Sequence, residues 1–423
     1  TVAVAIAGYD SEPARIAADF ASLVHSDRGA TVFGHGISTS PELAAFANAI
    51  MVRTYDWNDG MLARGGGHPS DMTSGILAVA EVCHSSGLDT LVAMTLAYEL
   101  LGGLGSEITI LEHALGPGTG MGAATALAAG KLLGLDREQL ANAASLALVP
   151  NLPLAVSRWG ELSMMKGATT AFAVRAGVFA AMLAGKGFTS AGEPFEGIYG
   201  LHKMLGPFEV KLPALPDGPR VVQMSHQKPI PADTQGLALL DLVPKIRAWA
   251  KAEDIESIDI DAPEHAARHV GDEAKYDPRT RETADHSLPY MLAVALVDGE
   301  ITLASYKPER FLDPALRPLM RKIAMHPDEA MTKLNKTAIV GATRPTPRRI
   351  TVRTKDGREL VEEVMWHKGT MHNPMTRDDI NAKLDTICRN VVDHAKRERI
   401  RSAWWNITEA PDVAEPIKTL ASF

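Results

Sequence analysis

Residues 167–183, GATTAFAVRAGVFAAML, form a small, apolar run with a single charged residue. Alanines fall on every side of a helix drawn through this run, so it predicts a buried helix that packs closely against its neighbours. Ser40-Pro41 places a proline in the first turn of another helix, and Asp136 with Gln139 has the spacing of a capping box. The first half of the chain is therefore predicted to be helical.

The character of the sequence changes after Phe208, where prolines cluster and mark a domain boundary. Beyond it, residues 255–261 alternate apolar and acidic side chains, which indicates a strand. Residues 350–364 predict a hairpin that turns at Asp356-Gly357. Helices are expected between these strands and after them, near residues 234–251, 289–297, 314–324 and 376–405. This second part is therefore predicted to be α+β.

Composition narrows the possible functions. The 423 residues carry a net charge of −8, which argues against a nucleic-acid partner and requires local cations to attract an anion. Two cysteines, Cys83 and Cys388, cannot ligate an iron–sulfur cluster or a Cys₄ zinc ion. They suit a reducing cytosol or organelle lumen, and we expect a cytoplasmic protein. No apolar run approaches about 18 residues, so no membrane is expected. The chain does not begin with Met, so we expect an N-terminal piece to be missing.

The most informative motif joins residues 55–59 (YDWND) to residues 65–71 (GGGHPSD). Glycines let the backbone approach a ligand closely. A histidine directly after such a loop, here His68, can be oriented for acid–base chemistry by an upstream carboxylate such as Asp56. The alternative is a surface loop in which Ser70 or Asp71 merely caps the next helix.

Other ionisable residues also have two explanations. Lys166, at the mouth of an apolar helix, either reaches out to solvent or presents its charge to a buried anion. Lys228 and Asp233 lie on a proline-stiffened loop, HQKPIPAD, which is alternatively a rigid linker. His265 and His269 have the helical spacing of metal ligands, but the sequence offers no third ligand nearby, so no metal is predicted.

Several of these stretches together resemble the 2-methylcitrate dehydratase (MmgE/PrpD) family, which also includes cis-aconitate decarboxylases and an iminodisuccinate epimerase. Their order and spacing agree with that family. They are residues 56–59 (DWND), 67–71 (GHPSD), 75–78 (GILA), 283–299 (TADHSLPYMLAVALVDG) and 373–376 (NPMT).

The resemblance implies a mainly α fold with a large all-helical domain and a smaller α+β lid domain. The helical domain would comprise residues 1–207, completed by C-terminal helices in residues 371–423, and the lid residues 208–370. It also implies a homodimer with no metal or organic cofactor.

By matching position, the resemblance implies an active-site cleft between the helical domain and the lid. It would hold Asp56, His68, Lys166, Lys228 and Tyr290. Asp233 is matched to a further polar position after Lys228, as a substrate-binding residue.

Three family positions differ, because Gly60, Pro117 and Thr169 replace a threonine and two histidines. We expect Gly60 to leave a small void and the pocket to be less polar and roomier on one side. The preferred substrate should then differ from methylcitrate. The alternative is that Asp59 or Asp233 supplies the missing contacts.

The chemistry of the family explains these residue types. Removing a proton next to a carboxylate builds negative charge, which nearby cations such as Lys166 and Lys228 offset. His68, oriented by Asp56, is expected to transfer the proton at carbon, and Tyr290 to donate to the leaving oxygen. The predicted function is a cofactor-independent hydro-lyase acting on a small di- or tricarboxylate. Alternatives are a decarboxylase, an epimerase, or a catalytically silent dimeric relative that binds carboxylates.

Overall fold

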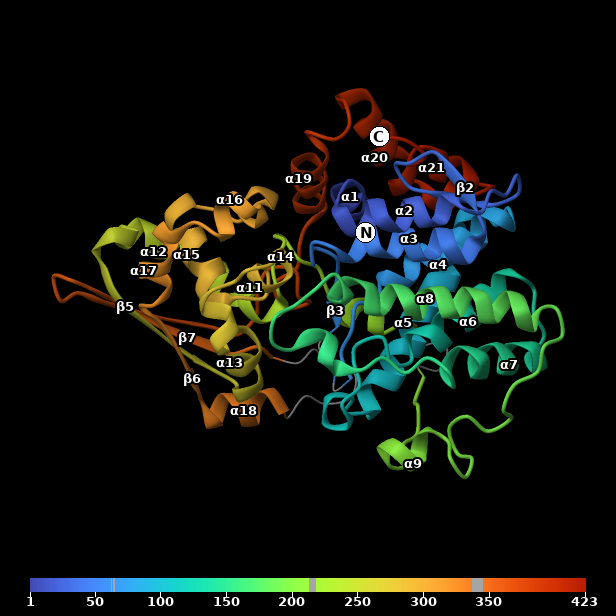
Figure 1. Ribbon diagram of the computed structural model, residues 1–423, viewed down its shortest axis with the longest axis horizontal. Helices are drawn as coiled ribbons and strands as arrows, with labels where there is room; N and C mark the ends of the chain where they lie inside the picture. The colour runs from blue at the N-terminus through green and yellow to red at the C-terminus, as the bar shows by residue number, and fades with distance from the viewer. Residues whose placement is uncertain (62, 64, 213–217, 337–344) are drawn as a thin grey trace.

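The computed structural model describes residues 1–61, 63, 65–212, 218–336 and 345–423. The fold is mainly helical with small sheets, as predicted. Figure 1 shows a helical region, which holds both ends of the chain, beside a mixed region of helices and strands. Each region has its own apolar core.

Five helices build the centre of the helical region. The predicted buried helix, α8 (Met165–Ala184), lies against α3 (Pro41–Arg53), α4 (Asp71–Val82), α6 (Met121–Leu132) and α7 (Arg137–Leu148). A Cβ at Gly177 would stand 2.5 Å from the backbone oxygen of Gly122 on α6, so the small residues are what let the helices approach. The predicted capping box opens α7.

Further elements complete the helical region. Two antiparallel pairs, β1 with β2 and β3 with β4, are small, and β3–β4 brings residues 60–61 beside residues 225–226. The elements are α1 (Val2–Gly8), α2 (Glu12–Ser22), β1 (Ala30–Val32), β2 (Ile37–Thr39), β3 (Gly60–Met61), α5 (Gly87–Glu107), α9 (Leu201–Leu205), α10 (Val221–Met224) and β4 (Ser225–His226).

Two helices, α5 and α8, are long and apolar enough to cross a membrane by length and composition, which the sequence analysis did not anticipate. In each of them 56% of the most apolar window is buried inside the protein. Core helices of a compact fold pass the same test.

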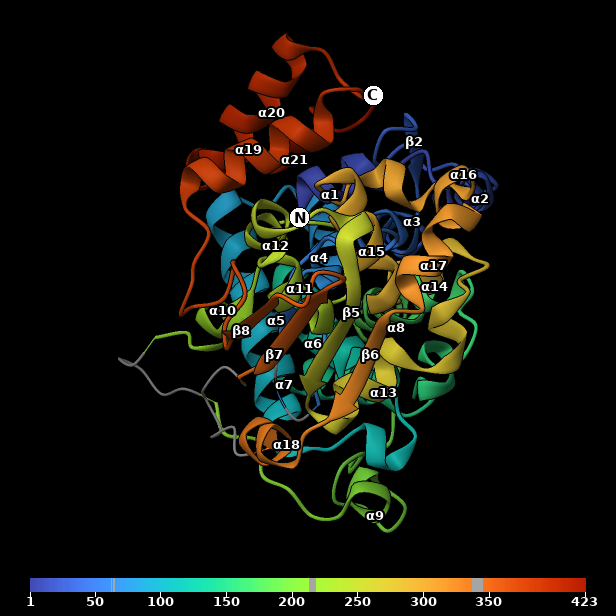
Figure 2. The ribbon, with the colours of Figure 1, turned by 90° about the vertical axis from the view of Figure 1, so that its left-hand side faces the viewer.

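The mixed region is built on a four-stranded sheet in the order β6-β5-β7-β8, which Figure 2 shows in front of the helical region. The predicted strand β5 (Ile255–Ala262) runs parallel to β6 (Ile323–Pro327) and antiparallel to β7 (Arg348–Thr354). The predicted hairpin joins β7 to β8 (Glu359–Val364). Alternate residues of β5 are buried, in the core that also contains α15 (Leu288–Asp298).

The remaining helices of the mixed region are α11 (Thr234–Leu240), α12 (Val243–Trp249), α13 (Glu264–Gly271), α14 (Arg281–Ala284), α16 (Pro308–Phe311), α17 (Arg317–Met320) and α18 (Glu329–Lys336). The helix predicted over residues 314–324 is too long. It ends at Met320, and Ile323 is instead buried in β6, where it pairs with Ile258.

The chain then returns to the helical region through α19 (Arg377–Cys388), α20 (His394–Trp405) and α21 (Ala414–Lys418). Leu384, Ile387 and Ile400 belong to the same apolar core as α1 and α3. The division into a helical domain and a lid stays a prediction.

Candidate active site

A cluster of charged side chains is buried where the helical and mixed regions meet. Arg53 ends α3 and Lys166 lies in the first turn of α8, whereas Asp285 and His286 lie between α14 and α15. None of the cluster's side chains is more than 9% exposed, so each charge needs a partner. We call this set the charge cluster: Arg53, Asp56, His68, Lys166, Lys228, Asp285 and His286.

Asp56 is the central acid of the charge cluster. Its Oδ1 accepts from the Arg53 guanidinium and from Lys228 Nζ, the latter at 2.6 Å. Lys228 Nζ also donates to the backbone oxygens of Asp56 and Ala232, at 3.0 and 3.1 Å. Burial alone would raise the pKa of Asp56, but the charges of Arg53, Lys228 and Lys166 outweigh it and hold this pKa well below its usual range.

His68 is a neutral imidazole whose tautomer is fixed by its two neighbours. A carbonyl can only accept, and the 2.7 Å contact with Asp59 O therefore places the proton on Nδ1. An arginine can only donate, so Nε2 accepts from Arg53 Nη2 at 2.8 Å. Burial, reinforced by the charge of Arg53, lowers the pKa of His68 well below its usual value. Nε2 is therefore an unprotonated hydrogen-bond acceptor at neutral pH.

The alternative in which residues 65–71 form a surface loop is wrong. Ser70 and Asp71 are at most 1% exposed. Asn58 Nδ2 donates to both, at 3.0 and 2.8 Å, and Asp59 Oδ1 accepts from the backbone N–H of Ser70 at 3.0 Å. The loop is thus fastened to the segment that carries Asp56.

Lys166 presents its charge inward. Its Nζ donates to both carboxylate oxygens of Asp285 at 2.9 Å and lies 3.9 Å from Asp56 Oδ2. The solvent-reaching alternative is therefore wrong. Burial lowers the pKa of Lys166 to about 8, although the two carboxylates raise it. Burial would raise the pKa of Asp285, but Lys166 and His286 lower it to about 2.

The loop that carries Lys228 and Asp233 runs into the protein, so the linker alternative is wrong as well. Lys228 is fully buried, and Asp233 caps α11 by accepting from Gln235 N at 2.8 Å. The structure thus brings Asp56, His68, Lys166, Lys228 and Asp233 into one neighbourhood. Their roles there stay predictions.

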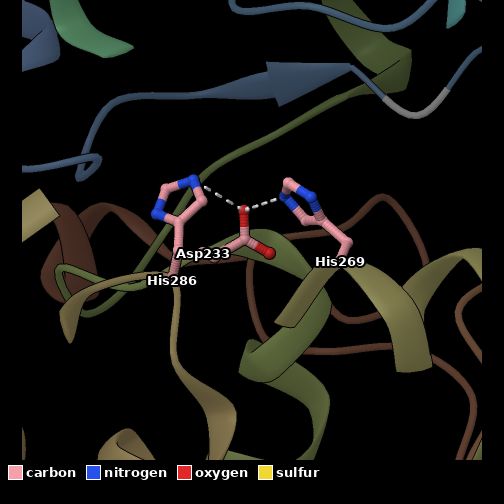
Figure 3. Close-up of side chains that lie close together, drawn as sticks. All are labelled: Asp233, His269 and His286. Atoms are coloured by element: carbon pink, nitrogen blue, oxygen red, sulfur yellow. Dashed lines mark ion pairs between the residues drawn. The ribbon is translucent and has the colours of Figure 1, made fainter. Parts of the chain in front are cut away.

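Asp233 also brings together two histidines to which the sequence analysis gave no role. Its carboxylate lies between the rings of His269 and His286 (Figure 3), with Oδ2 3.6 and 3.3 Å from their Nε2 atoms. Asp285 Oδ1 accepts from His286 Nδ1 at 2.6 Å. Burial lowers the pKa of His286 to about 4.

Arg158 is a buried cation that sequence reasoning missed. It ends a 3₁₀ turn, Ala155–Arg158, and is 9% exposed. Within the described part of the chain, its Nε and Nη2 have no hydrogen-bond partner. Burial and the charge of Arg53 lower its pKa to about 10, while Asp56 and Asp233 raise it. A lone arginine in an apolar segment gives no pattern that would have marked it.

Tyr290 does not join the charge cluster. Its ring packs in the core of the mixed region, 6.4 Å from that of Tyr306, and its hydroxyl donates to the backbone oxygen of Ser305. Burial raises its pKa. We expected Tyr290 to donate a proton to the leaving oxygen. This expectation is corrected, because the hydroxyl of Tyr290 already donates to the backbone carbonyl of Ser305.

Gly60 leaves no void. A Cβ at this position would stand 2.5 Å from the imidazole of His226, its partner in the β3–β4 pair. The expected extra room at Gly60 is thus wrong, because the His226 ring fills it. Thr169 bonds back to Met165 O within α8 at 2.7 Å, so its hydroxyl is committed to its own helix.

A cavity of about 510 Å³ lies beside the charge cluster. Its wall includes Asn58, Asp59 and the cluster residue Lys228, together with Lys383 and Trp404 of the C-terminal helices α19 and α20. Asp56, His68 and Lys166 do not line it. The volume is in the usual range for small-molecule sites, and Lys228 is the cation that the cavity and the cluster share.

Comparison with known proteins identifies the family. Residues 1–211 match the MmgE/PrpD N-terminal domain and residues 231–408 the MmgE/PrpD C-terminal domain. A 2-methylcitrate dehydratase of Escherichia coli (strain K12) is 29% identical over 395 residues, which cover 86% of this chain and 78% of that protein. One from Cupriavidus necator is 29% identical over 378 residues, 80% of this chain and 74% of its own.

A more distant relative has another name. The cis-aconitate decarboxylase-like protein oryM of Aspergillus oryzae is 24% identical over 414 residues, which cover 91% of this chain and 83% of its own. The two domain matches together span most of the sequence. This chain belongs to the MmgE/PrpD family.

Proposed function

We propose that the chain is a lyase that eliminates water from a small hydroxy di- or tricarboxylate, by taking a proton from the carbon next to a carboxylate. The observation that carries this is the buried charge cluster, in which a neutral imidazole and several cations surround Asp56. Dehydratase is also the name given to the relatives at 29% identity.

Arg158 is the first receptor for a substrate carboxylate. Lys166 and Lys228 already hold Asp285 and Asp56, whereas Arg158 keeps two buried N–H groups for which the described residues supply no acceptor. A carboxylate that bound there would satisfy both groups through charge-assisted hydrogen bonds. Lys228, on the wall of the cavity, has all three of its donors in use, so it contributes its charge and not a direct contact to a second carboxylate.

His68 is the base in this mechanism. Its Nε2 is held by Arg53, so proton transfer requires this contact to loosen. A substrate carboxylate supplies the means, since it competes with the imidazole for the donors of Arg53. The freed Nε2 then takes the proton from carbon, and the cations stabilise the charge that develops on the carboxylate.

Lys166 replaces Tyr290 as donor to the leaving hydroxyl. Its pKa of about 8 makes the ammonium a stronger acid than an ordinary lysine while it stays charged at neutral pH. Asp285, with a pKa of about 2, remains ionised and orients the ammonium.

This role predicts an alkaline limit to activity. The ammonium of Lys166 is present below about pH 8 and is lost above it, so kcat/KM is expected to fall about tenfold per pH unit above that value. Lys166→Arg keeps the charge but cannot give up a proton, so activity should fall by about 10²–10⁴-fold, and the activity that remains should lose this alkaline limit. An unshifted limit in this variant, measured in pH profiles of active enzyme, would remove Lys166 from the assignment.

Decarboxylation is the second candidate, because one relative carries a decarboxylase-like name. The same cations would stabilise the carbanion left by loss of CO₂. Decarboxylation differs from dehydration in its products, since CO₂ leaves in place of water and a proton is added at carbon.

A product assay of purified, chelator-treated protein tests the proposal. Offered methylcitrate, citrate, cis-aconitate and related diacids, the protein should raise alkene absorbance from a hydroxy acid without releasing CO₂. Because Pro117 lacks the side chain expected at its position, we expect kcat/KM to be highest for a substrate other than methylcitrate. CO₂ release would select the decarboxylase. Binding of the whole panel without turnover would identify a silent carboxylate binder.

A further inference from the structure

Lys383 joins the two segments that carry the central ion pair of the charge cluster. It lies in α19, and its Nζ donates to the backbone oxygens of Trp57 and Lys228, both at 2.7 Å. Trp57 directly follows Asp56, and Lys228 is the residue whose Nζ lies 2.6 Å from Asp56 Oδ1. One side chain of the C-terminal helices therefore holds both halves of this ion pair by their backbones.

The ring of Trp57 joins the same two segments. Its Nε1 donates to the backbone oxygen of Pro229 at 3.0 Å, so the indole binds the loop that carries Lys228. The Nζ of Lys383 lies 5.4 Å from the centroid of this ring, within range of a cation–π contact. Trp57 is 4% exposed, so these contacts are made inside the protein.

A lysine in this place carries a cost that an apolar side chain would avoid. Burial and the charge of Lys228 lower the pKa of Lys383 to about 7, although the charge of Asp59 raises it. Both hydrogen-bond partners of Nζ are carbonyls, which can only accept. An ammonium has three N–H groups and a neutral amine has two, so Lys383 can keep both bonds in either protonation state.

We propose that Lys383 is a positioning residue that keeps the ammonium of Lys228 on Asp56 while a proton is transferred at the substrate. This inference deepens the proposed lyase function and rests on it. Lys383 is not in the charge cluster and acts through Lys228, whose charge offsets the charge that develops on the substrate. That charge has to stay in place, because a displacement of about 1 Å can lower a rate by about 100-fold.

Lys383→Met removes both hydrogen bonds and keeps a side chain of similar length. We expect kcat of the folded variant to fall by about 10–100-fold, measured well below its midpoint of thermal unfolding. KM should change by less than about threefold, because Arg158, the proposed receptor for the substrate carboxylate, is untouched. A lysine that served stability alone would lower the midpoint of unfolding and leave kcat unchanged.

Two further substitutions of Lys383 complete the kinetic test. Lys383→Arg keeps a donor for each carbonyl and should hold kcat within about threefold of the unsubstituted value. Lys383→Gln is the milder variant if Lys383→Met does not fold. Its shorter amide can still donate, so kcat should fall in the same direction but by less.

Lys368→Met is the matched control. The Nζ of Lys368 pairs with Asp379 Oδ2 at 2.9 Å near the start of α19, and both side chains are 35% exposed. This surface pair is worth little. We therefore expect kcat and KM of the control variant to equal those of the unsubstituted protein.

Amide hydrogen exchange of the substrate-free full chain, followed by mass spectrometry, tests the contacts without turnover. In Lys383→Met, the peptides that cover residues 55–59 and 226–233 should both exchange faster, by about tenfold or more, because both segments lose a hydrogen bond to a charged group. In Lys383→Arg and Lys368→Met they should exchange at the unsubstituted rate.

The two measurements separate this inference from the lyase proposal. Unchanged amide exchange in Lys383→Met overturns the inference whatever the activity. Normal kcat in a Lys383→Met protein with faster amide exchange also overturns it, since the contacts then serve stability alone. If the unsubstituted protein turns over no compound of the panel, the lyase proposal fails and the positioning role fails with it, even where amide exchange shows that Lys383 joins the two segments.

Discussion

Asp56→Asn is expected to lower the free energy of unfolding by about 3–5 kcal/mol, because it leaves two buried cations without their anion. The Arg53 guanidinium and Lys228 Nζ both bond to the carboxylate that is lost, and both side chains are fully buried. Asparagine has the same shape and tolerates the left-handed backbone at this position, where φ is +49°. The effect measured is therefore that of the charge.

Denaturant unfolding of the purified variant checks this value. Asp259→Asn is the matched control, since Asp259 pairs with Arg353 and His326 at the surface, where such pairs are worth about 0–1 kcal/mol. Lys228→Met in the Asp56→Asn background should restore part of the loss, because the two sites are coupled. A loss as small as that of the control would mean that the cluster's charges are not balanced as described.

His68→Ala is expected to reduce kcat by about 10²–10⁴-fold, the usual contribution of a general acid–base group. The substitution also leaves Arg53 one acceptor short, which we expect to cost about 1–3 kcal/mol of stability. His68→Gln separates these effects, because its amide oxygen can accept from Arg53 but is not a base. Both variants should be inactive, and His68→Gln the more stable.

Kinetics and circular dichroism of the same preparations check the role of His68. A folded His68→Ala protein with near-normal kcat on the substrate of the unsubstituted protein would assign the base to another group. His286 would be the first to test, because its Nε2 is buried and unbonded among the described residues.

Local patterns were enough to predict much of the fold. The alternation in residues 255–261, the capping box at Asp136 and the small residues of α8 each depend on neighbours in sequence, and the structure confirms all three. The helix predicted to reach residue 324 failed for the opposite reason. Ile323 is held by pairing with Ile258 in a distant strand, which overrides the local preference.

The site divides in the same way. His68 and Lys228 lie in sequence motifs from which a site could be predicted. Arg158 and His286 could not be predicted in this way, because the residues that folding brings beside them come from segments that are distant in the sequence. Tyr290 was placed wrongly because its hydroxyl finds Ser305, which no local pattern reveals. The space expected at Gly60 is filled by His226, which lies across a strand pair from a distant segment.

Hydrogen exchange at carbon tests the central claim, that the charge cluster moves a proton next to a carboxylate. Incubated in D₂O with the di- and tricarboxylate panel and followed by NMR, the protein should place deuterium on the carbon adjacent to a carboxylate of at least one compound. Dehydration run in reverse, decarboxylation and epimerisation all require this step. The account predicts that His68→Ala lowers the rate of deuterium incorporation by at least about 100-fold. It is contradicted if compounds of the panel bind but none gains deuterium, or if His68→Ala exchanges at the unsubstituted rate.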